Sequence, residues 1–470
     1  MKIFRRFFSA IDRLHWLWLA LAAPFLLFPN PARTPAMLVV PGTWLLHWLV
    51  ARGRRIKKHP GYRAPFLPLT PLNGILLLLA VMVLVSEWAT YDLAFSLPKI
   101  SGVVLGIGIY YAIARLRRRK GGWGWSLVAF VGIGLGMAAL GLLGTNWFNW
   151  KISLLNPITS HIPKLVGGLQ GAESGFHPNE IAGALSWVLP LMIVLCFARL
   201  TPSPTEKGGW GLKARPWWLW LLRIALWLST LFMGAVFVLT QSRTAYLALA
   251  LTLALMFWLV LPGKGRWIFL GLMVAVGIAG GAYLSGERIT QGVDWLTGSG
   301  VVSEQAFSLN SLESRLEVWS RAIYGLQDFP FTGMGMNTFR QVVHVLYPLF
   351  MIAPDVDMGH AHNEFLQAGL DLGIPGMIAL IALYIGAFWM LSRVWRHYPI
   401  FNLQRVAALG LGGGLFAHLL YGLTDAVALG AKPGLLFWML LGLIAGLFGQ
   451  VFKSRDVIES EPVYTEVEND

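Results

Sequence analysis

The sequence predicts an all-α integral membrane protein with about 12 transmembrane helices and a large outer-face loop that contains amphipathic helices. Hydrophobic residues make up 56% of the 470 residues, charged residues only 13%, and 22 residues are Trp, a composition that excludes an ordinary soluble domain. Apolar runs long enough to cross a bilayer recur along the chain. Lys and Arg gather in short clusters between these runs, as orientation signals do.

The first apolar run, from Leu14 to Phe28, follows the basic residues Lys2, Arg5 and Arg6. A basic segment before an apolar run is also the pattern of a signal peptide. We interpret the run as an uncleaved first span, because many more spans follow it.

Twelve candidate spans emerge when runs of about 20 apolar residues, or shorter ones with interfacial aromatic ends, are sought along the chain. They lie near residues 14–29, 36–51, 70–88, 94–114, 123–144, 179–199, 217–240, 244–262, 267–284, 366–392, 404–427 and 434–452. Basic clusters follow every second span, so the positive-inside rule places both termini in the cytoplasm.

The charge and cysteine content exclude two further readings of the composition. The net charge is +14, but because the basic residues are distributed as membrane orientation signals we expect no nucleic-acid partner. Cys196 is the only cysteine, so the chain forms no intrachain disulfide.

Two outer segments, 145–178 and 285–365, are long. The second has roughly 80 residues, more than a simple connection needs, and should carry structure or function of its own. Leu312, Leu316, Trp319 and Ile323 follow helical spacing there and predict an amphipathic helix at the outer interface. We therefore divide the chain into N-terminal helices and outer loop (1–178), a membrane core with the outer loop 285–365 (179–452) and an acidic tail (453–470).

His362 is the leading candidate for a catalytic residue, because it stands at the predicted start of the tenth span, followed by Asn363. The positive end of a helix favours a neutral imidazole and welcomes an anion beside it. A neutral histidine near pH 7 suits a general base for a sugar hydroxyl. The alternative is an interfacial histidine that only caps the helix.

Arg243 and Arg315 are the candidate anion-binding residues. Arg243 lies in a tight outer turn between two spans, where a fixed guanidinium could bind phosphate oxygens in pairs, or simply reach the lipid headgroups. Arg315 shares a face of the amphipathic helix with Trp319 and could face the membrane cavity, or belong to a solvated helix face.

Supporting roles are possible for five further residues. Asp425, at the outer end of the eleventh span, is a candidate partner for a basic group, because a charge at that depth is paired or functional by default. The others are His360, Arg321, Arg340 and Asn363. No cysteine pair or HExxH pattern occurs, so we predict neither a metal nor a cofactor.

Together these motifs resemble the O-antigen ligase and O-antigen polymerase superfamily. His362 and Asn363, nine residues, then Gly373, Ile374, Pro375 and Gly376 are similar to the family pattern H-[NSQ]-x9-G-x-x-G. The pair Ser242 and Arg243 and the run from Arg315 through Trp319 to PFTGMG (330–335) are similar to two further family features. The likeness extends from about Gly171 to Asp425.

The resemblance implies a metal-independent membrane glycosyltransferase that takes a glycan from an undecaprenyl pyrophosphate donor at the outer, periplasmic face of the cytoplasmic membrane. His362 would correspond to the essential histidine, and Arg243 and Arg315 to the arginines that bind the donor pyrophosphate. A single displacement with His362 as base would invert the anomeric centre. The acceptor stays open: lipid A core for a ligase, a second lipid-linked repeat unit for a polymerase, or Ser and Thr for a protein O-oligosaccharyltransferase.

The main alternative is a transporter or flippase for polyisoprenoid-linked sugars, and a third is a noncatalytic membrane scaffold. A transporter would need charged or broken helices near the bilayer midplane, whereas most charges here lie at membrane boundaries or in loops. A base such as His362 would serve no purpose in either.

Overall fold

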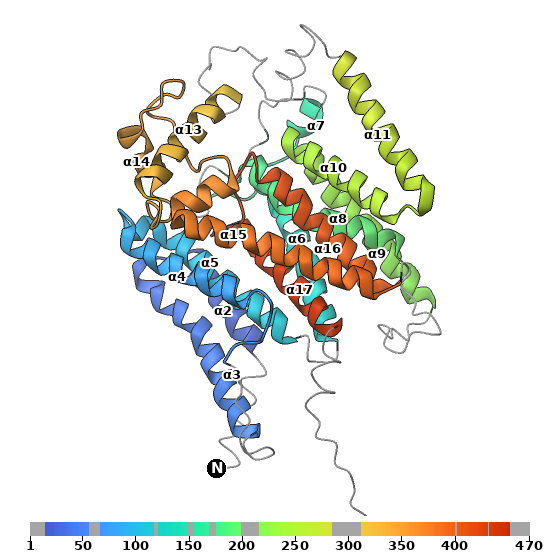
Figure 1. The fold of residues 1–470 in the computed structure, drawn as a ribbon, viewed down its shortest axis with the longest axis horizontal. Helices are drawn as coiled ribbons and strands as arrows, with labels where there is room; N and C mark the ends of the chain where they lie inside the picture. Colours follow the sequence, from blue (N-terminus) through green and yellow to red (C-terminus); the bar gives the residue numbers. More distant parts are fainter. Residues whose placement is uncertain are drawn as a thin grey trace, which may run out of the picture.

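The computed structural model describes residues 15–55, 66–116, 121–145, 147, 152, 155–168, 175–198, 216–283, 312–399, 402–430 and 432–451. Within these ranges the regular structure is helical (Figure 1). A single isolated bridge pairs Thr145 with Phe176 in the same ranges. The prediction of an all-α protein is confirmed. The acidic tail and residues 285–311 of the outer loop lie outside the described residues.

The helices follow the chain from blue to red in Figure 1. They are α2 (His15–Leu27), the 3-10 helix η1 (Pro31–Leu38), α3 (Val39–Arg55), α4 (Asn73–Ala89), α5 (Leu93–Leu116), α6 (Gly122–Gly144), α7 (Asn156–Thr159), α8 (Pro178–Phe197), α9 (Pro216–Leu239), α10 (Arg243–Val260), α11 (Gly263–Tyr283), α13 (Leu312–Asp328), α14 (Phe339–Leu346), α15 (Glu364–His397), α16 (Leu403–Tyr421), the 3-10 helix η3 (Lys432–Gly434) and α17 (Leu435–Val451).

Eight of the described helical segments are long and apolar enough to cross a membrane: α5, α6, α8, α9, α10, α15, α16 and α17 together with η3. Two shorter apolar helices, α2 and α4, coincide with two more predicted spans. The predicted spans 36–51 and 267–284 overlap α3 and α11. A multi-span membrane protein is therefore confirmed, and the total of twelve spans stays a prediction.

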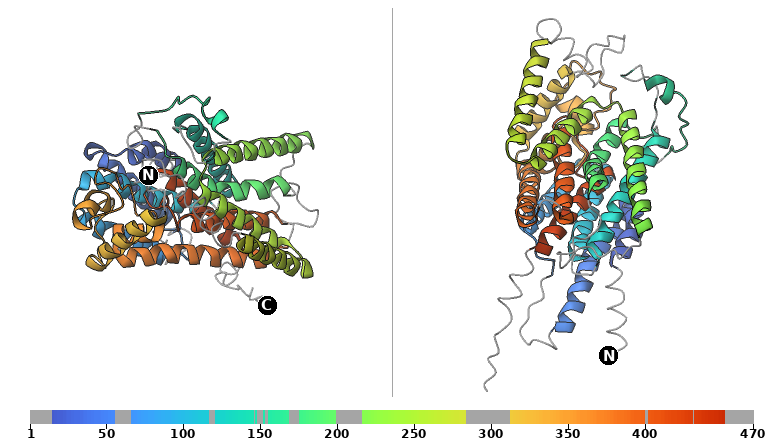
Figure 2. Two further views of the ribbon diagram at one scale, coloured as in Figure 1. Left: turned by 90° about the horizontal axis from the view of Figure 1, so that it is seen from above. Right: turned by 90° about the vertical axis from the view of Figure 1, so that its right-hand side faces the viewer.

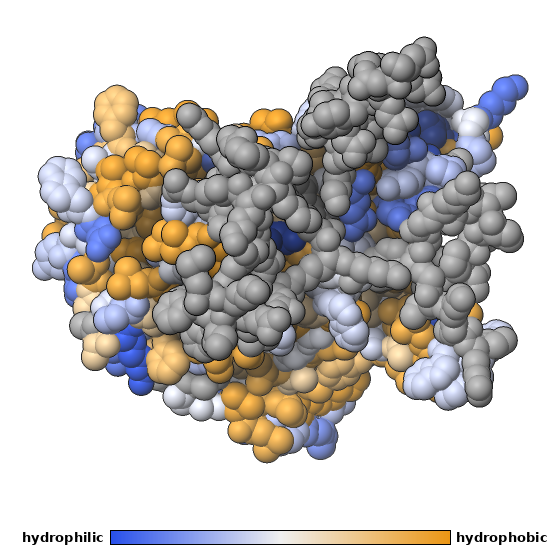
Figure 3. Space-filling model, turned by 90° about the horizontal axis from the view of Figure 1, so that it is seen from below, coloured by the Kyte–Doolittle hydropathy of each residue, from blue (hydrophilic) through white to orange (hydrophobic). Residues whose placement is uncertain are grey.

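Helices α16 and α17 lie near the middle of the bundle (Figure 2, red). Buried side chains of α8, α15, α16 and α17 belong to one continuous core. Small residues allow α16 to approach α8 closely, because a Cβ on Gly414 would lie 2.2 Å from the Trp187 carbonyl oxygen. Outward-facing residues such as Trp88 and Trp125 are more than 70% exposed. Exposed apolar side chains of this kind are expected for helices surrounded by lipid. On the face drawn in Figure 3, hydrophobic areas lie beside hydrophilic ones.

A sharp break divides α15 at Gly373, whose φ of 71° is left-handed. The segment 330–334, which follows α13, fills this break. Ile374 donates its N–H to the Pro330 carbonyl at 2.7 Å, and Met334 donates its N–H to the Leu370 carbonyl at 2.7 Å. The two glycine-containing segments, 330–335 and 373–376, therefore bring two backbones into direct contact.

Helices α13 and α14 lie over the first part of α15 (Figure 1) and share a small core of their own. Val318 and Ala322 of α13 are fully buried against residues that include Phe339 of α14 and Leu370 of α15. The amphipathic helix expected around Leu312 to Ile323 is thus confirmed as α13. Its C-terminal end is fixed to α15 by the segment 330–334.

We predict that Gly373→Ala destabilises the protein by about 2 kcal/mol or more, because alanine resists a positive φ. In addition, its Cβ would lie 2.5 Å from the Phe331 carbonyl oxygen. Thermal unfolding in detergent should show a lower midpoint than that of Gly136→Ala, a matched control in α6 where a Cβ meets nothing within 4 Å. Equal midpoints for the two variants would contradict the role assigned to this contact.

Candidate active site

His362 lies two residues before Glu364, the first residue of α15. The sequence had placed it at the start of the helix. Asn363 is the N-cap residue, and its side chain accepts the N–H groups of Phe365 at 3.0 Å and Leu366 at 3.1 Å. His362 itself has a left-handed backbone with a φ of 49°, which is uncommon for a residue with a side chain. Asn363 therefore caps the first turn of α15, and the side chain of His362 takes no part in that capping.

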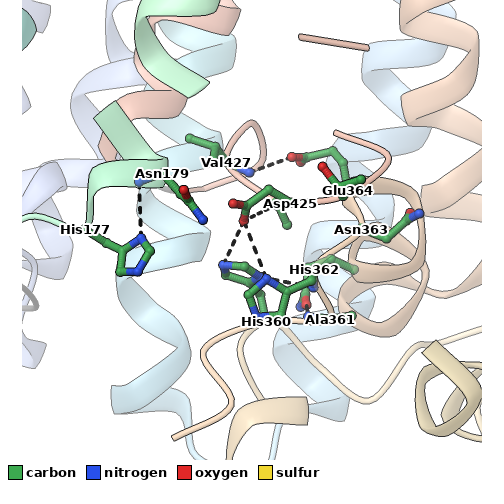
Figure 4. A network of polar contacts seen from close by, with 12 residues as sticks. His177, Asn179, His360, Ala361, His362, Asn363, Glu364, Asp425 and Val427 are labelled. Atoms are coloured by element: carbon green, nitrogen blue, oxygen red, sulfur yellow. Dashed lines mark hydrogen bonds and ion pairs between the residues drawn. The ribbon is translucent and has the colours of Figure 1, made fainter. Parts of the chain in front are cut away.

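The imidazole of His362 meets the imidazole of His360 and the carboxylate of Asp425 in one cluster (Figure 4). Asp425 Oδ1 lies 3.2 Å from His360 Nε2 and 3.9 Å from His362 Nδ1. The carboxylate also accepts the hydroxyl of Tyr421 at 2.7 Å on Oδ2 and the N–H of Ala426 at 2.9 Å on Oδ1. Asp425 was predicted as the partner of a basic group, and it faces two histidines.

Hydrogen bonds fix which nitrogen of His360 carries the proton. The backbone N–H of His362 donates to His360 Nδ1 at 3.1 Å, so this nitrogen must be an acceptor. A neutral His360 then carries its proton on Nε2, which lies 3.2 Å from Asp425 Oδ1. His360 thus holds Asp425 in place while remaining neutral.

His362 has no such hydrogen bond. Its Nδ1 is buried and has no hydrogen-bond partner among the described residues. A modest rotation would bring it from 3.9 Å to hydrogen-bonding distance of Asp425. Catalytic hydrogen bonds are often long before substrate binds, so this separation suits a histidine that is oriented by a carboxylate during the reaction.

The protonation states follow from burial. Burial, together with the nearby His360, lowers the pKa of His362 to about 3, although Asp425 acts in the opposite direction. Burial also lowers the pKa of His360. Burial favours the protonated form of Asp425, but the two histidines, the Tyr421 hydroxyl and Arg315 together hold its pKa below its usual range. Near neutral pH, His362 is a neutral imidazole beside an ionised carboxylate.

The same three residues have the ligand types of a metal site, and their ligand atoms lie within 4.8 Å of one another. A metal ion on His360 Nε2 would require the imidazole proton to sit on Nδ1. That nitrogen already accepts the backbone N–H of His362. The hydrogen-bonding pattern of His360 therefore fits an imidazole that carries its proton on Nε2.

Arg315 on α13 lies near this cluster. Its charge lowers the pKa of His362 and of Asp425, which requires proximity. Trp319, one turn further along α13, donates its indole N–H to the His362 carbonyl at 3.3 Å and ties the helix to the site. The Nε atom of Arg315 is buried and has no hydrogen-bond partner among the described residues. A guanidinium in that state favours an anionic ligand.

Arg243 is the first residue of α10 and follows a tight turn, as predicted. Gln241 in the turn has a φ of 51°, and its side-chain oxygen accepts the N–H of Ile152 at 2.8 Å. Arg243 is only 7% exposed, which leaves its guanidinium with little freedom at one end of the helix bundle. Figure 1 shows the start of α10 at the same end of the molecule as α13.

Three other predicted residues have structural partners. Asn363 caps α15 and donates its side-chain N–H to the Leu423 carbonyl at 3.1 Å. Arg321 donates to the Pro348 carbonyl at 2.8 Å and pairs with Glu317 of its own helix. Arg340 forms an exposed ion pair with Asp357. The structure therefore brings together His360, His362, Asn363 and Asp425, with Arg315 close by, and engages Arg321 and Arg340 elsewhere.

The sequence analysis missed four polar residues that support the cluster. Lys99 of α5 forms a buried ion pair with Asp371 of α15 at 2.6 Å, and Asp371 also accepts the side-chain amide of Gln367 at 2.8 Å. Gln367 in turn accepts the N–H of Ala361 at 2.7 Å, between the two histidines. Charges at membrane depth were the available signal for Lys99 and Asp371.

The fourth missed residue is Glu364, directly after the histidine motif. Its carboxylate accepts the backbone N–H of Val427 at 2.6 Å, as Figure 4 shows. The side chain is therefore directed toward the chain segment that follows Asp425. Its position after an N-cap predicted only a favourable charge in the first helical turn.

Comparison with known proteins identifies one family. Residues 228–381, about a third of the chain, match the family model described as O-antigen ligase. This range contains Arg243, Arg315, His362 and the glycine motif, whereas Asp425 lies beyond it. No curated protein sequence matches the chain. The match confirms the resemblance that the motifs indicated: residues 228–381 are similar to the O-antigen ligase and polymerase superfamily.

Proposed function

We propose that this protein is a glycosyltransferase of the cytoplasmic membrane. It would transfer or polymerise a glycan from an undecaprenyl pyrophosphate-linked donor onto an acceptor hydroxyl at the outer face. The observation that carries the proposal is the neutral, buried His362 beside an ionised Asp425, with the guanidinium of Arg315 close by. A base next to an anion-binding group is what transfer from a lipid pyrophosphate requires, and a transporter would need no base.

In the proposed mechanism the acceptor hydroxyl gives its proton to His362 as its oxygen attacks the anomeric carbon of the donor. The bond from that carbon to the pyrophosphate oxygen breaks, and the electron pair leaves with the lipid pyrophosphate. Arg243 and Arg315 stabilise the departing charge. Asp425 orients the imidazole through Nδ1, so that Nε2 takes the proton. A single displacement inverts the anomeric centre and needs no metal.

The low pKa of His362 describes the free enzyme. An imidazole with a pKa of about 3 is a weak base, since a general base is most effective when its pKa lies near the working pH. A bound pyrophosphate brings negative charge to the site and favours the imidazolium, as does a closer Asp425. Donor binding would therefore strengthen the base just before it is used.

The function is tested in a knockout strain complemented with wild type, His362→Ala or Arg243→Ala at equal membrane levels. We expect both variants to lose the glycan ladder and to accumulate the lipid-linked donor on the outer leaflet. Arg340→Ala, which loses an exposed ion pair with Asp357 and a contact with the Phe95 ring, is the matched control and should restore the ladder. The ladder pattern of wild type separates a polymerase from a ligase, and a normal ladder with His362→Ala would exclude it as the base.

Arg315 is tested by Arg315→Lys, which keeps the charge and removes the planar pair of donors that binds two phosphate oxygens. In proteoliposomes with purified donor, we expect KM for the donor to rise about tenfold, corresponding to the loss of one charged hydrogen bond. Arg340→Lys should leave KM unchanged within about twofold, because surface ion pairs contribute little. An unchanged KM for Arg315→Lys would remove this arginine from the donor site.

The pH dependence should differ between the free enzyme and its donor complex. Because the pKa of His362 is lowered, its basic form persists at neutral pH and is lost only as the pH falls toward about 3. We expect kcat/KM for the donor to stay level from about pH 5 to about pH 8, and kcat to decline at a higher pH than kcat/KM on the acid side. A kcat/KM profile that falls near pH 6.5 would indicate a solvated histidine and contradict the burial of this group.

A further inference from the structure

The side chain of Glu364 bonds to another part of the chain and not to its own helix. It is the first residue of α15 and only 2% exposed. Its Oε2 accepts the N–H groups of Val427 at 2.6 Å and Ala428 at 2.9 Å, and its Oε1 accepts the N–H of Leu429 at 3.2 Å. Three consecutive backbone donors thus converge on one carboxylate.

The other end of the same loop is also tied to the start of α15. The backbone N–H of Glu364 donates to the Gly422 carbonyl at 2.7 Å. The neighbouring Asn363 donates its side-chain N–H to the Leu423 carbonyl at 3.1 Å. Residues 422–429, which we call the Asp425 loop, are therefore fastened at both ends to the residues directly after His362.

The buried N–H groups of this loop depend on the Glu364 carboxylate as their acceptor. The Asp425 loop leaves α16 at the outer end of the bundle, and residues 427–429 are buried. Buried backbone N–H groups that lose their acceptor cost the free energy of desolvation, and hydrogen bonds to a charged acceptor are the stronger kind. A helix start that needed only a favourable charge would be served by a solvent-exposed glutamate.

We propose that Glu364 is a positioning residue that holds the Asp425 loop so that the Asp425 carboxylate faces His362. The inference rests on the proposed function, because it assigns Asp425 the task of orienting the base. The carboxylate of Glu364 contacts the loop backbone, and it would act on the imidazole only through Asp425. Through Glu364, the position of α15 determines the position of the Asp425 carboxylate, 61 residues further along the chain.

Two substitutions separate the position of Asp425 from donor binding. Glu364→Ala removes all three acceptor contacts and should lower kcat about 100-fold, within the range that positioned proton transfer contributes. Glu364→Gln keeps one carbonyl oxygen for Val427 and Ala428 and should retain kcat within about tenfold of wild type. KM for the donor should be unchanged within about twofold in both, since the arginines are untouched.

The decisive measurement combines Glu364→Gln with Asp425→Asn and follows single turnovers of purified donor. If Glu364 acts through Asp425, then Glu364→Gln lowers the rate in the wild-type background but changes it less than about twofold in the Asp425→Asn background. Effects that multiply, or a rise in KM equal to the fall in kcat, would overturn the proposal and leave Glu364 as a contributor to stability alone.

Glu317→Ala is the matched control, because the Glu317 carboxylate on α13 also accepts two consecutive backbone N–H groups, from Phe350 at 2.6 Å and Met351 at 2.9 Å. It releases a different loop and should leave kcat within about threefold of wild type. An equal loss in this variant would mean that any freed loop impairs the enzyme and would overturn the proposal. A wild-type protein without transfer activity would instead refute the proposed function, which distinguishes the two failures.

Discussion

The break in α15 is the constraint on which the arrangement around the histidines depends. A helix within a bilayer must satisfy its backbone hydrogen bonds internally, so an interruption at Gly373 is stable only where other protein groups replace them. The segment 330–334 does this by pairing with Leu370 and Ile374. Because that segment directly follows α13, the repair of the helix also fixes α13 over the histidines. The contact between the segment 330–334 and the break at Gly373 therefore also positions α13, the helix that carries Arg315.

Buried polar groups on both sides of His362 serve the same end. On one side, Lys99, Asp371 and Gln367 form a chain of contacts that ends at the N–H of Ala361. On the other side, Glu364 fastens the Asp425 loop. Paired charges of this kind contribute little net stability, and breaking one partner is costly. Their value here is geometric, since a left-handed residue before a helix keeps its conformation only when its surroundings determine it.

The sequence predicted the helical membrane class, α13 and the turn before Arg243, because each depends on local spacing or on a short motif. It could not predict that Glu364 bonds to residues 427–429, or that Lys99 meets Asp371. These contacts join positions 63 to 272 residues apart. Burial had the same limitation: the helix dipole was expected to keep His362 neutral, whereas in the structure its low pKa follows mainly from desolvation. This desolvation arises from tertiary packing, which neither a motif nor residue spacing reveals.

The charges around His362 determine the order of steps in the proposed reaction. Without a donor, His362 is a weak base, because burial and the nearby positive charge of Arg315 lower its pKa. In the proposed mechanism, a donor pyrophosphate would neutralise that positive charge and favour protonation of His362, so part of the binding free energy of the donor would strengthen the base. The acceptor hydroxyl would then meet a competent base only when the leaving group is already held. Such an order would favour transfer to the acceptor over hydrolysis, and it would need the orienting carboxylate in place before the donor arrives.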